Sequence, residues 1–271
     1  MAYTDIDKPD DYFNTVQYTG NKPTGQSITG VGFQPDWYWS KNTPNTGYNH
    51  SLIDSVRGVS KILSSNNTSA EFTSADSLTS FDSDGFTLGA DANGYVNQQP
   101  DNHVAWCWKA GGTASSNTDG SITSSVSANT TAGFSICKYT GVTGAQTFGH
   151  SLGAVPKMVI VKNLDSTENW RVYHHSITAS KYLKLNTTDA ETSDTGPFSG
   201  TTPTSTLVYV GGDAGTCENG SEHIAYCFAE KKGFSRFGSY QGSGNSDGPM
   251  IWCGFKPAWV MIKRTDTTQG W

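Results

Sequence analysis

The sequence predicts an all-β protein built from tandem β-sandwich units of jelly-roll type. The composition combines 12% aromatic residues and 30 glycines with abundant serine and threonine. Aromatic and β-branched side chains favour strands over helices. Turn sequences rich in Gly, Asp and Asn return about every ten residues, as in sandwiches and barrels. The same sequence blocks also recur along the chain, which is typical of repeated structural units.

Three blocks carry the repeat. The first is Tyr-x-Gly, and it begins at Tyr18, Tyr139 and Tyr240. The second runs from a proline to a lysine six residues later, and its copies are 35–41, 156–162 and 257–263. The third is a His-x-Ala-aromatic-Cys-aromatic block, found at 103–108 and 223–228. The distance from the first block to the third is nearly equal in its two copies, so the unit has a constant length.

The repeat divides the chain into five parts. We expect an N-terminal anchoring arm (1–11), a first β unit (12–110), a Ser/Thr-rich connector (111–132), a second β unit (133–232) and the incomplete start of a third unit (233–271). The connector is polar and offers little to a core, apart from one extended segment at 122–126. The arm likewise has little to bury, and we expect it to be mobile in the isolated chain.

Each recurring block reads as a strand. In the proline-to-lysine block, Trp37 and Trp39 share one face, because successive side chains of a strand alternate between faces. In the third block, Trp106 and Trp108 form a face of large apolar residues, while Ala105 and Cys107 form a face of small ones. We therefore expect the tryptophans of both blocks to pack in the core. Helical spacing is found at 52–63, where Gly58 interrupts it, so a helix there is the less favoured reading.

Charge and hydropathy exclude several classes of partner. The net charge is -6 and the basic residues form no cluster, so a nucleic-acid partner is not expected. No apolar run reaches the length of a membrane span. The first residues show no secretory signal, and the five cysteines form no CxxC pair. We therefore expect reduced thiols in a protein assembled in a cytoplasm.

No metalloprotease or nucleotide-binding motif is present in the sequence. HExxH and P-loop patterns are both missing. His103 and His223 share one repeat position, which favours a packing role over catalysis. The 82–85 segment resembles a fragment of a calcium loop but lacks the later ligands, so a turn is expected. We predict no enzyme activity and no catalytic, cofactor-binding or metal-binding residues.

Loop residues are the better candidates for surface binding. Two polar, aromatic-containing loops could contact a sugar or a protein on another surface. Their candidate residues are Tyr48, Asn49, His50, Tyr95, Asn97, Gln98 and Asn102. Ordinary solvated loops with no ligand remain the favoured alternative.

Several phrases of the sequence resemble a repeat family of marine bacteriophages. They include DKPDDYFNTVQYTGN, GVGFQPDWYWSKN, SFDSDGFTLG, HVAWCWKAGG and LGAVPKMVIVKN. The similar proteins are called tail-fibre-like or are domains of unknown function. The resemblance extends over nearly the whole chain, and it implies a virion protein in an external appendage that meets the host surface.

The leading hypothesis is a structural protein of a phage tail or fibre, located in the virion, that anchors to the tail and contributes to host adhesion. Alternatives are a capsid decoration or other tail-assembly protein, and a depolymerase of host glycan. The expected partners in the virion are a tail adaptor or nozzle and neighbouring fibre subunits. The subunits would form a homo-oligomer, with a trimer favoured. A host-surface glycan or protein is a further expected partner. Because the third unit stops mid-repeat, we also expect the native chain to continue past Trp271.

Overall fold

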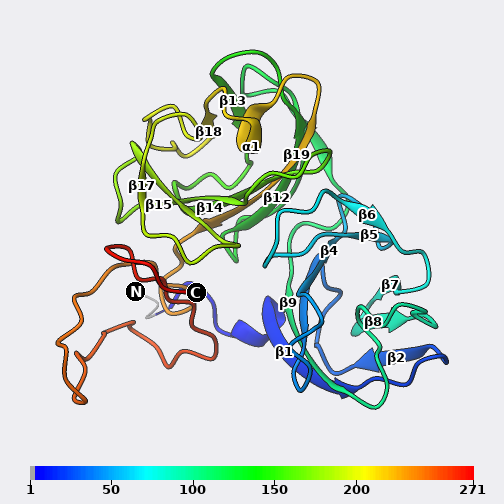
Figure 1. Ribbon diagram of the computed structural model, residues 1–271. Helices are drawn as coiled ribbons and strands as arrows, with labels where there is room; N and C mark the ends of the chain where they lie inside the picture. The colour runs from blue at the N-terminus through cyan, green and yellow to red at the C-terminus, as the bar shows by residue number, and fades with distance from the viewer. Residues whose placement is uncertain (1–3) are drawn as a thin grey trace.

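The computed structural model describes residues 4–271, and these form an all-β protein (Figure 1). In this part of the chain, helix is limited to α1 (Ala214–Cys217) and the 3-10 helix η1 (Pro9–Asp11). The all-β prediction is therefore confirmed. The segment with helical spacing holds two strands, β4 (Ser51–Asp54) and β5 (Lys61–Ile62).

The first repeat region, residues 12–110, is built on a four-stranded antiparallel sheet. Its order is β1 (Phe13–Thr19), β9 (Asn102–Trp108), β3 (Trp37–Asn42) and β4. A second, three-stranded sheet has the order β2 (Gln26–Thr29), β8 (Gly85–Leu88) and β7 (Leu78–Asp82). Strand β5 pairs with β6 (Phe72–Thr73) beside them.

The second repeat region, residues 133–232, contributes most of an eight-stranded sheet. Its strand order is β10 (Ser115–Asn117), β11 (Ser124–Asn129), β12 (Phe134–Thr140), β19 (Glu222–Ala229), β14 (Pro156–Asn163), β15 (Arg171–His174), β16 (Lys181–Lys184) and β17 (Thr192–Ser193). A two-stranded sheet joins β13 (Gln146–Gly149) to β18 (Leu207–Val210).

The two sheets share a four-strand arrangement. The order β1-β9-β3-β4 of the first matches β12-β19-β14-β15 of the second. The register also matches: Trp39 lies opposite Trp106 in the first sheet, and Ile160 lies opposite Tyr226 in the second. The recurring sequence blocks thus occupy equivalent places in the two sheets.

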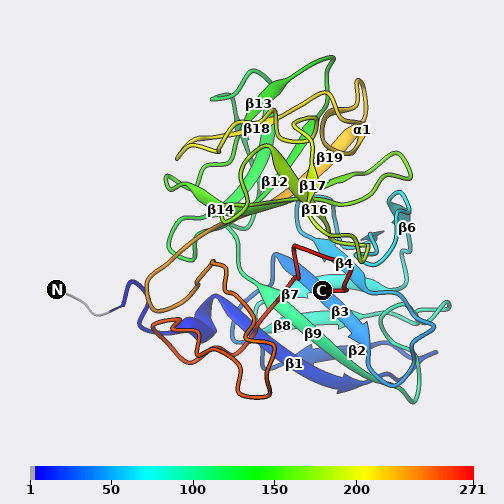
Figure 2. The same ribbon diagram turned by 60° about the vertical axis from the view of Figure 1, so that its left-hand side comes forward.

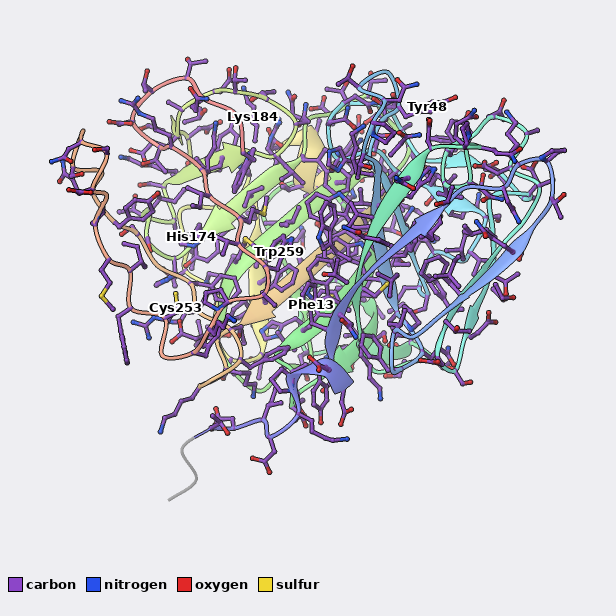
Figure 3. The ribbon with its side chains drawn as sticks, turned by 90° about the horizontal axis from the view of Figure 1, so that it is seen from below. Phe13, Tyr48, His174, Lys184, Cys253 and Trp259 are labelled. Carbon is purple, nitrogen blue, oxygen red and sulfur yellow. The ribbon has the colours of Figure 1, made fainter. Side chains whose placement is uncertain are left out.

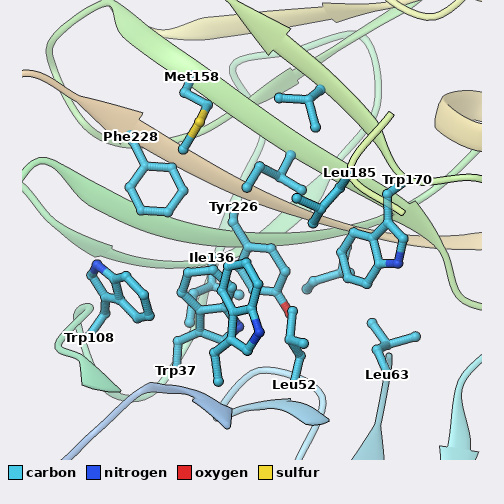
Figure 4. Packing of buried hydrophobic residues seen from close by; sticks show 14 of the residues in the cluster. Trp37, Leu52, Leu63, Trp108, Ile136, Met158, Trp170, Leu185, Tyr226 and Phe228 are labelled. Carbon is cyan, nitrogen blue, oxygen red and sulfur yellow. The ribbon is translucent and has the colours of Figure 1, made fainter. Parts of the chain in front are cut away.

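The two sheets pack against each other through their large apolar faces (Figure 4). At the centre, the ring of Trp37 stacks on Tyr226 with centroids 4.3 Å apart. Trp39 and Trp108 are buried in the same cluster, as predicted, while Trp106 is only partly buried at its border. The two small faces are covered by the shorter sheets, which complete two further core clusters.

Residues 111–132, expected to be a polar connector, extend the second sheet. They form β10 and β11, and β11 pairs with the outer edge of β12 over its full length. Ile122 and Val126 are buried in the core of the second region. Their alternation with serine places the apolar side chains on one face, so even a Ser-rich segment covers the sheet edge.

The arm also has contacts that the sequence did not predict. Its described part, residues 4–11, lies against the end of β19. The amide N–H of Asp5 donates to the carbonyl oxygen of Lys232 over 3.0 Å, and Ile6 is 4% exposed. Contrary to the expectation that the arm has little to bury, Ile6 is a buried core residue.

The last part of the chain, residues 233–271, contains no named strand (Figures 1 and 2). It passes from Cys253 along the border between the two sheets toward Lys184, with Trp259 beside Phe13 (Figure 3). Trp259, Met261 and Trp271 pack against the central cluster. This segment therefore closes one side of the seam between the sheets.

Candidate functional site

The two candidate loops lie at the same end of the first sheet. One follows β3 and the other precedes β9, and these strands are antiparallel neighbours. Hydrogen bonds join the loops: the hydroxyl of Ser51 donates to the carbonyl of Tyr95 over 3.2 Å, and the amide of Thr43 donates to the carbonyl of Asn102 over 2.9 Å. We call residues 43–50 and 95–102 the loop surface.

The candidate residues differ in how far they reach solvent. Asn49 and Asn102 are exposed. The half-buried members are Tyr48, His50, Tyr95 and Gln98. Each of these side chains is thus partly accessible to solvent.

Asn97 is a correction to the sequence-based set, because it is fully buried. Its amide nitrogen donates to the carbonyls of Gly89 and Thr24, at 3.0 and 3.1 Å, and its amide oxygen accepts from the backbone N–H of Asn21. A buried amide must satisfy its hydrogen bonds internally. Asn97 therefore holds three chain segments together behind the loop surface and does not contact a ligand.

His50 is held in a defined state by two tryptophans. The indole N–H of Trp39 donates to His50 Nδ1 over 2.9 Å, and the imidazole ring lies parallel to Trp106. Burial, with a smaller contribution from the charge of Lys41, lowers the pKa of His50 to about 4. The ring is thus neutral at pH 7, and because Nδ1 accepts, its hydrogen is on Nε2.

The recurring Tyr and His blocks form two equivalent buried stacks. The rings of Tyr18 and His103 are parallel with centroids 5.2 Å apart, and those of Tyr139 and His223 are parallel at 5.3 Å. The Tyr18 hydroxyl donates to the carbonyl of Val96 over 2.7 Å. Burial lowers the pKa of both histidines. These residues hold loops against the sheet, which agrees with the packing role predicted for the histidines.

The recurring lysines have a role that the sequence analysis did not assign. Each ammonium group donates to carbonyl oxygens of loops, and for Lys41 and Lys162 these belong to the loop that follows the block. Lys41 binds the carbonyls of Asn45 and Tyr48, at 3.0 and 2.8 Å. Lys162, which is completely buried, binds those of Asn163 and Ser166. Lys263 binds those of Thr188 and Gln269.

A buried ionic network joins the two sheets. Arg57 Nε lies 2.5 Å from Asp54 Oδ2, and its Nη1 lies 3.0 Å from Glu71 Oε2. Across the interface, the hydroxyl of Tyr226 donates to Asp54 Oδ2 over 2.8 Å. The pair Asp54–Arg57 is visible in the sequence as an i, i+3 spacing, but the partner from β19 is not. The network fixes the register of one sheet on the other.

The acidic turn at 82–85 is occupied by internal contacts. The carboxylate of Asp84 accepts from the backbone N–H groups of Gly30 and Gly32, and that of Asp82 accepts from the hydroxyls of Ser80 and Thr87. The bonds of Asp82 lie within the hairpin between β7 and β8, and those of Asp84 join its turn to the segment that follows β2. Within residues 4–271, no group of three or more His, Cys, Asp or Glu side chains is arranged to hold a metal ion.

The thiols are structural as well. The five cysteines are free, and four of them are buried. Burial raises the pKa of Cys107 and Cys227, so neither is a thiolate at pH 7.

Two open hollows of about 420 and 400 Å³ lie elsewhere on the chain. The first is lined by Asp36, whose carboxylate accepts from the backbone N–H groups of Ala110 and Gly112 and so holds the chain where the first region ends. The second is lined by hydroxyl groups and the Lys138–Glu222 ion pair.

The geometry defines an all-β protein whose polar groups mainly maintain its architecture. The chain belongs to the family of a domain of unknown function, DUF7483, whose model matches residues 8–271. Comparison with curated proteins and with solved structures gave no match. Among the described residues, none of the helices has the length and apolar character needed to cross a membrane.

Proposed function

We propose that this chain is a structural protein of a bacteriophage virion, a subunit of a tail fibre or similar appendage. In this proposal it anchors to a tail adaptor, a nozzle or neighbouring fibre subunits, and it contributes to adhesion at the host surface. Each repeat region would be one β-sandwich unit of jelly-roll type, with the units stacked in tandem. The resemblance of the recurring phrases to marine-phage repeat proteins supports the proposal.

One observation carries most of the weight. In the two complete copies, the recurring tyrosines, histidines and lysines hold loops or strands in place. A scaffold that repeats its structural contacts and leaves a polar loop surface fits a building block with a binding face better than an enzyme. We propose a homotrimer, because several copies turn weak surface contacts into avidity.

Immunogold electron microscopy tests the location. Antibodies against the purified chain should label the tail or its fibres on intact particles. Label on the head would instead indicate a capsid decoration protein, and unlabelled particles would refute a virion role.

Incubation with host envelope polysaccharide tests the activity at the loop surface. We expect binding without release of reducing ends, since release would identify a depolymerase. The double variant Asn49→Ala/Asn102→Ala should weaken binding. The matched control is Glu222→Ala, at the position of β19 that corresponds to Asn102 of β9.

A further inference from the structure

The third copy of the proline-to-lysine block is exposed where the first two copies are buried. Trp259 and Met261 face the seam between the sheets and are partly buried against the central cluster. On the opposite side of the block, Val260 is 64% exposed and Ile262 is 51% exposed. Successive side chains alternate between faces in an extended segment. The block therefore has one covered face and one open apolar face.

The two internal copies show what covers this face when the block is complete. Tyr38 of β3 and Val159 and Val161 of β14 occupy the equivalent positions, and each is completely buried. In both copies, the block is flanked on one edge by the His-x-Ala strand, β9 or β19. The large residues of that strand lie opposite the large residues of the block, and Cys and Ala lie opposite the positions of Val260 and Ile262.

The main chain of the third block is also unpaired. Within the described residues 4–271, no main-chain hydrogen bond joins residues 257–262 to another segment. By contrast, β14 pairs with β15 on one edge and β19 on the other. An extended segment with free N–H and C=O groups and an open apolar face is a template for strand addition.

We propose that residues 257–263 accept a β-strand from another polypeptide, with the alternation of large and small apolar residues found in β9 and β19. The incoming strand pairs along the free edge of the block. Its large side chains lie opposite Trp259 and Met261, and its small ones lie opposite Val260 and Ile262. Main-chain hydrogen bonds supply affinity, and the alternation supplies specificity. This inference does not depend on the virion assignment, because it follows from the contacts of the three copies alone.

A peptide with the sequence of residues 222–229, carrying Cys227→Ala to prevent oxidation, serves as the probe. Its binding to the full chain is measured by fluorescence anisotropy. A control peptide of the same composition has each adjacent pair of residues exchanged, which moves the large side chains to the other face. We expect saturable binding of the first peptide, at least about tenfold tighter than that of the control.

Two variants of the full chain locate the binding. Val260→Asp should weaken binding of the peptide at least about tenfold, because it places a charge on the face to be covered. Val155→Asp alters an equally apolar residue that is 40% exposed elsewhere, and it should leave binding unchanged. Both positions are on the surface, so circular dichroism should show that both variants remain folded.

Three outcomes overturn the proposal. The first is equal binding of the two peptides, and the second is binding that Val260→Asp does not weaken. The third is sedimentation showing a dimer that Val260→Asp dissociates, without any peptide binding, in which case a second copy covers the block.

Discussion

The proline-to-lysine block has nearly the same alternation in Pro156–Asn163 and in residues 257–263, yet only the first is a strand. Strand β14 lies between β15 and β19, whereas the later copy has no neighbouring strand. Its large side chains still face the central cluster, and its lysine still binds loop carbonyls. Thus the pattern determines which side chains share a face, and the neighbouring strand determines whether the segment pairs.

The largest expected difference between copies is at the tryptophan position. Trp37→Ala should lower the free energy of unfolding by about 3–5 kcal/mol, because the ring is buried between the two sheets and the truncation leaves a cavity. Trp259→Ala, at the equivalent position of the third copy, should cost about 1 kcal/mol, because that ring is only partly buried. Urea unfolding of both variants measures the difference, and equal losses would contradict this comparison.

The next largest effect concerns ion pairs in the two repeat regions. Arg57→Met should cost about 3–5 kcal/mol, because it leaves Asp54 buried without its cation. In the second region, Arg171→Met should cost about 1–2 kcal/mol, because its partner Asp213 is partly exposed and can be hydrated. Chemical denaturation of the two variants is the measurement. A smaller loss for Arg57→Met than for Arg171→Met would show that the interface network contributes little.

Much of the sheet architecture could be predicted from the sequence. The alternation of Trp37 and Trp39 indicated their common face, and the shared repeat position of His103 and His223 indicated a structural role. The pairing of Tyr226 with Asp54 could not be predicted, because it joins residues far apart in the chain. Within 111–132, the extended segment expected at 122–126 corresponds in part to β11, whereas β10 was missed, because serine-rich alternation carries a weak apolar signal.

The two candidate loops lie next to each other in the structure. Both loops were selected by their polar and aromatic residues, and the topology brings them together because β3 and β9 are antiparallel neighbours. Asn97 looked like a surface residue because sequence alone does not show that Asn21, Thr24 and Gly89 supply its hydrogen-bond partners.

The recurring lysines should differ according to burial. Lys162→Met should cost about 1–3 kcal/mol, because the carbonyls of Asn163 and Ser166 would remain buried without a donor. Burial already lowers the pKa of Lys162 to about 8, so part of the loss is offset by removing a buried charge. Lys263→Met should change stability by no more than about 0.5 kcal/mol, because its surroundings are open to solvent. Thermal unfolding at pH 7 compares the two, and a larger effect at Lys263 would refute the dependence on burial.

The smallest expected effect is on stability in mild acid, for which we compare one histidine from each repeat region. Burial lowers the pKa of His50 and of His174 to about 4, below the value of about 6.5 expected in the unfolded chain. Between these values the unfolded state binds protons that the folded state does not. The stability contributed by each neutral ring is therefore complete above about pH 6.5 and is lost as the pH falls toward 4.

The unaltered chain should lose stability between pH 7 and pH 5. In His50→Gln and in His174→Gln this loss should each time be smaller by about 1 kcal/mol, a value that allows for the partial exposure of the rings. Glutamine keeps a side-chain acceptor for the indole N–H of Trp39, so the variant at position 50 should remain folded. The control is His175→Gln, which changes an exposed neighbour of His174. Melting temperatures at the two pH values provide the measurement. If both variants lost as much stability as the unaltered chain over this range, protonation of these histidines would not be the cause of the acid sensitivity.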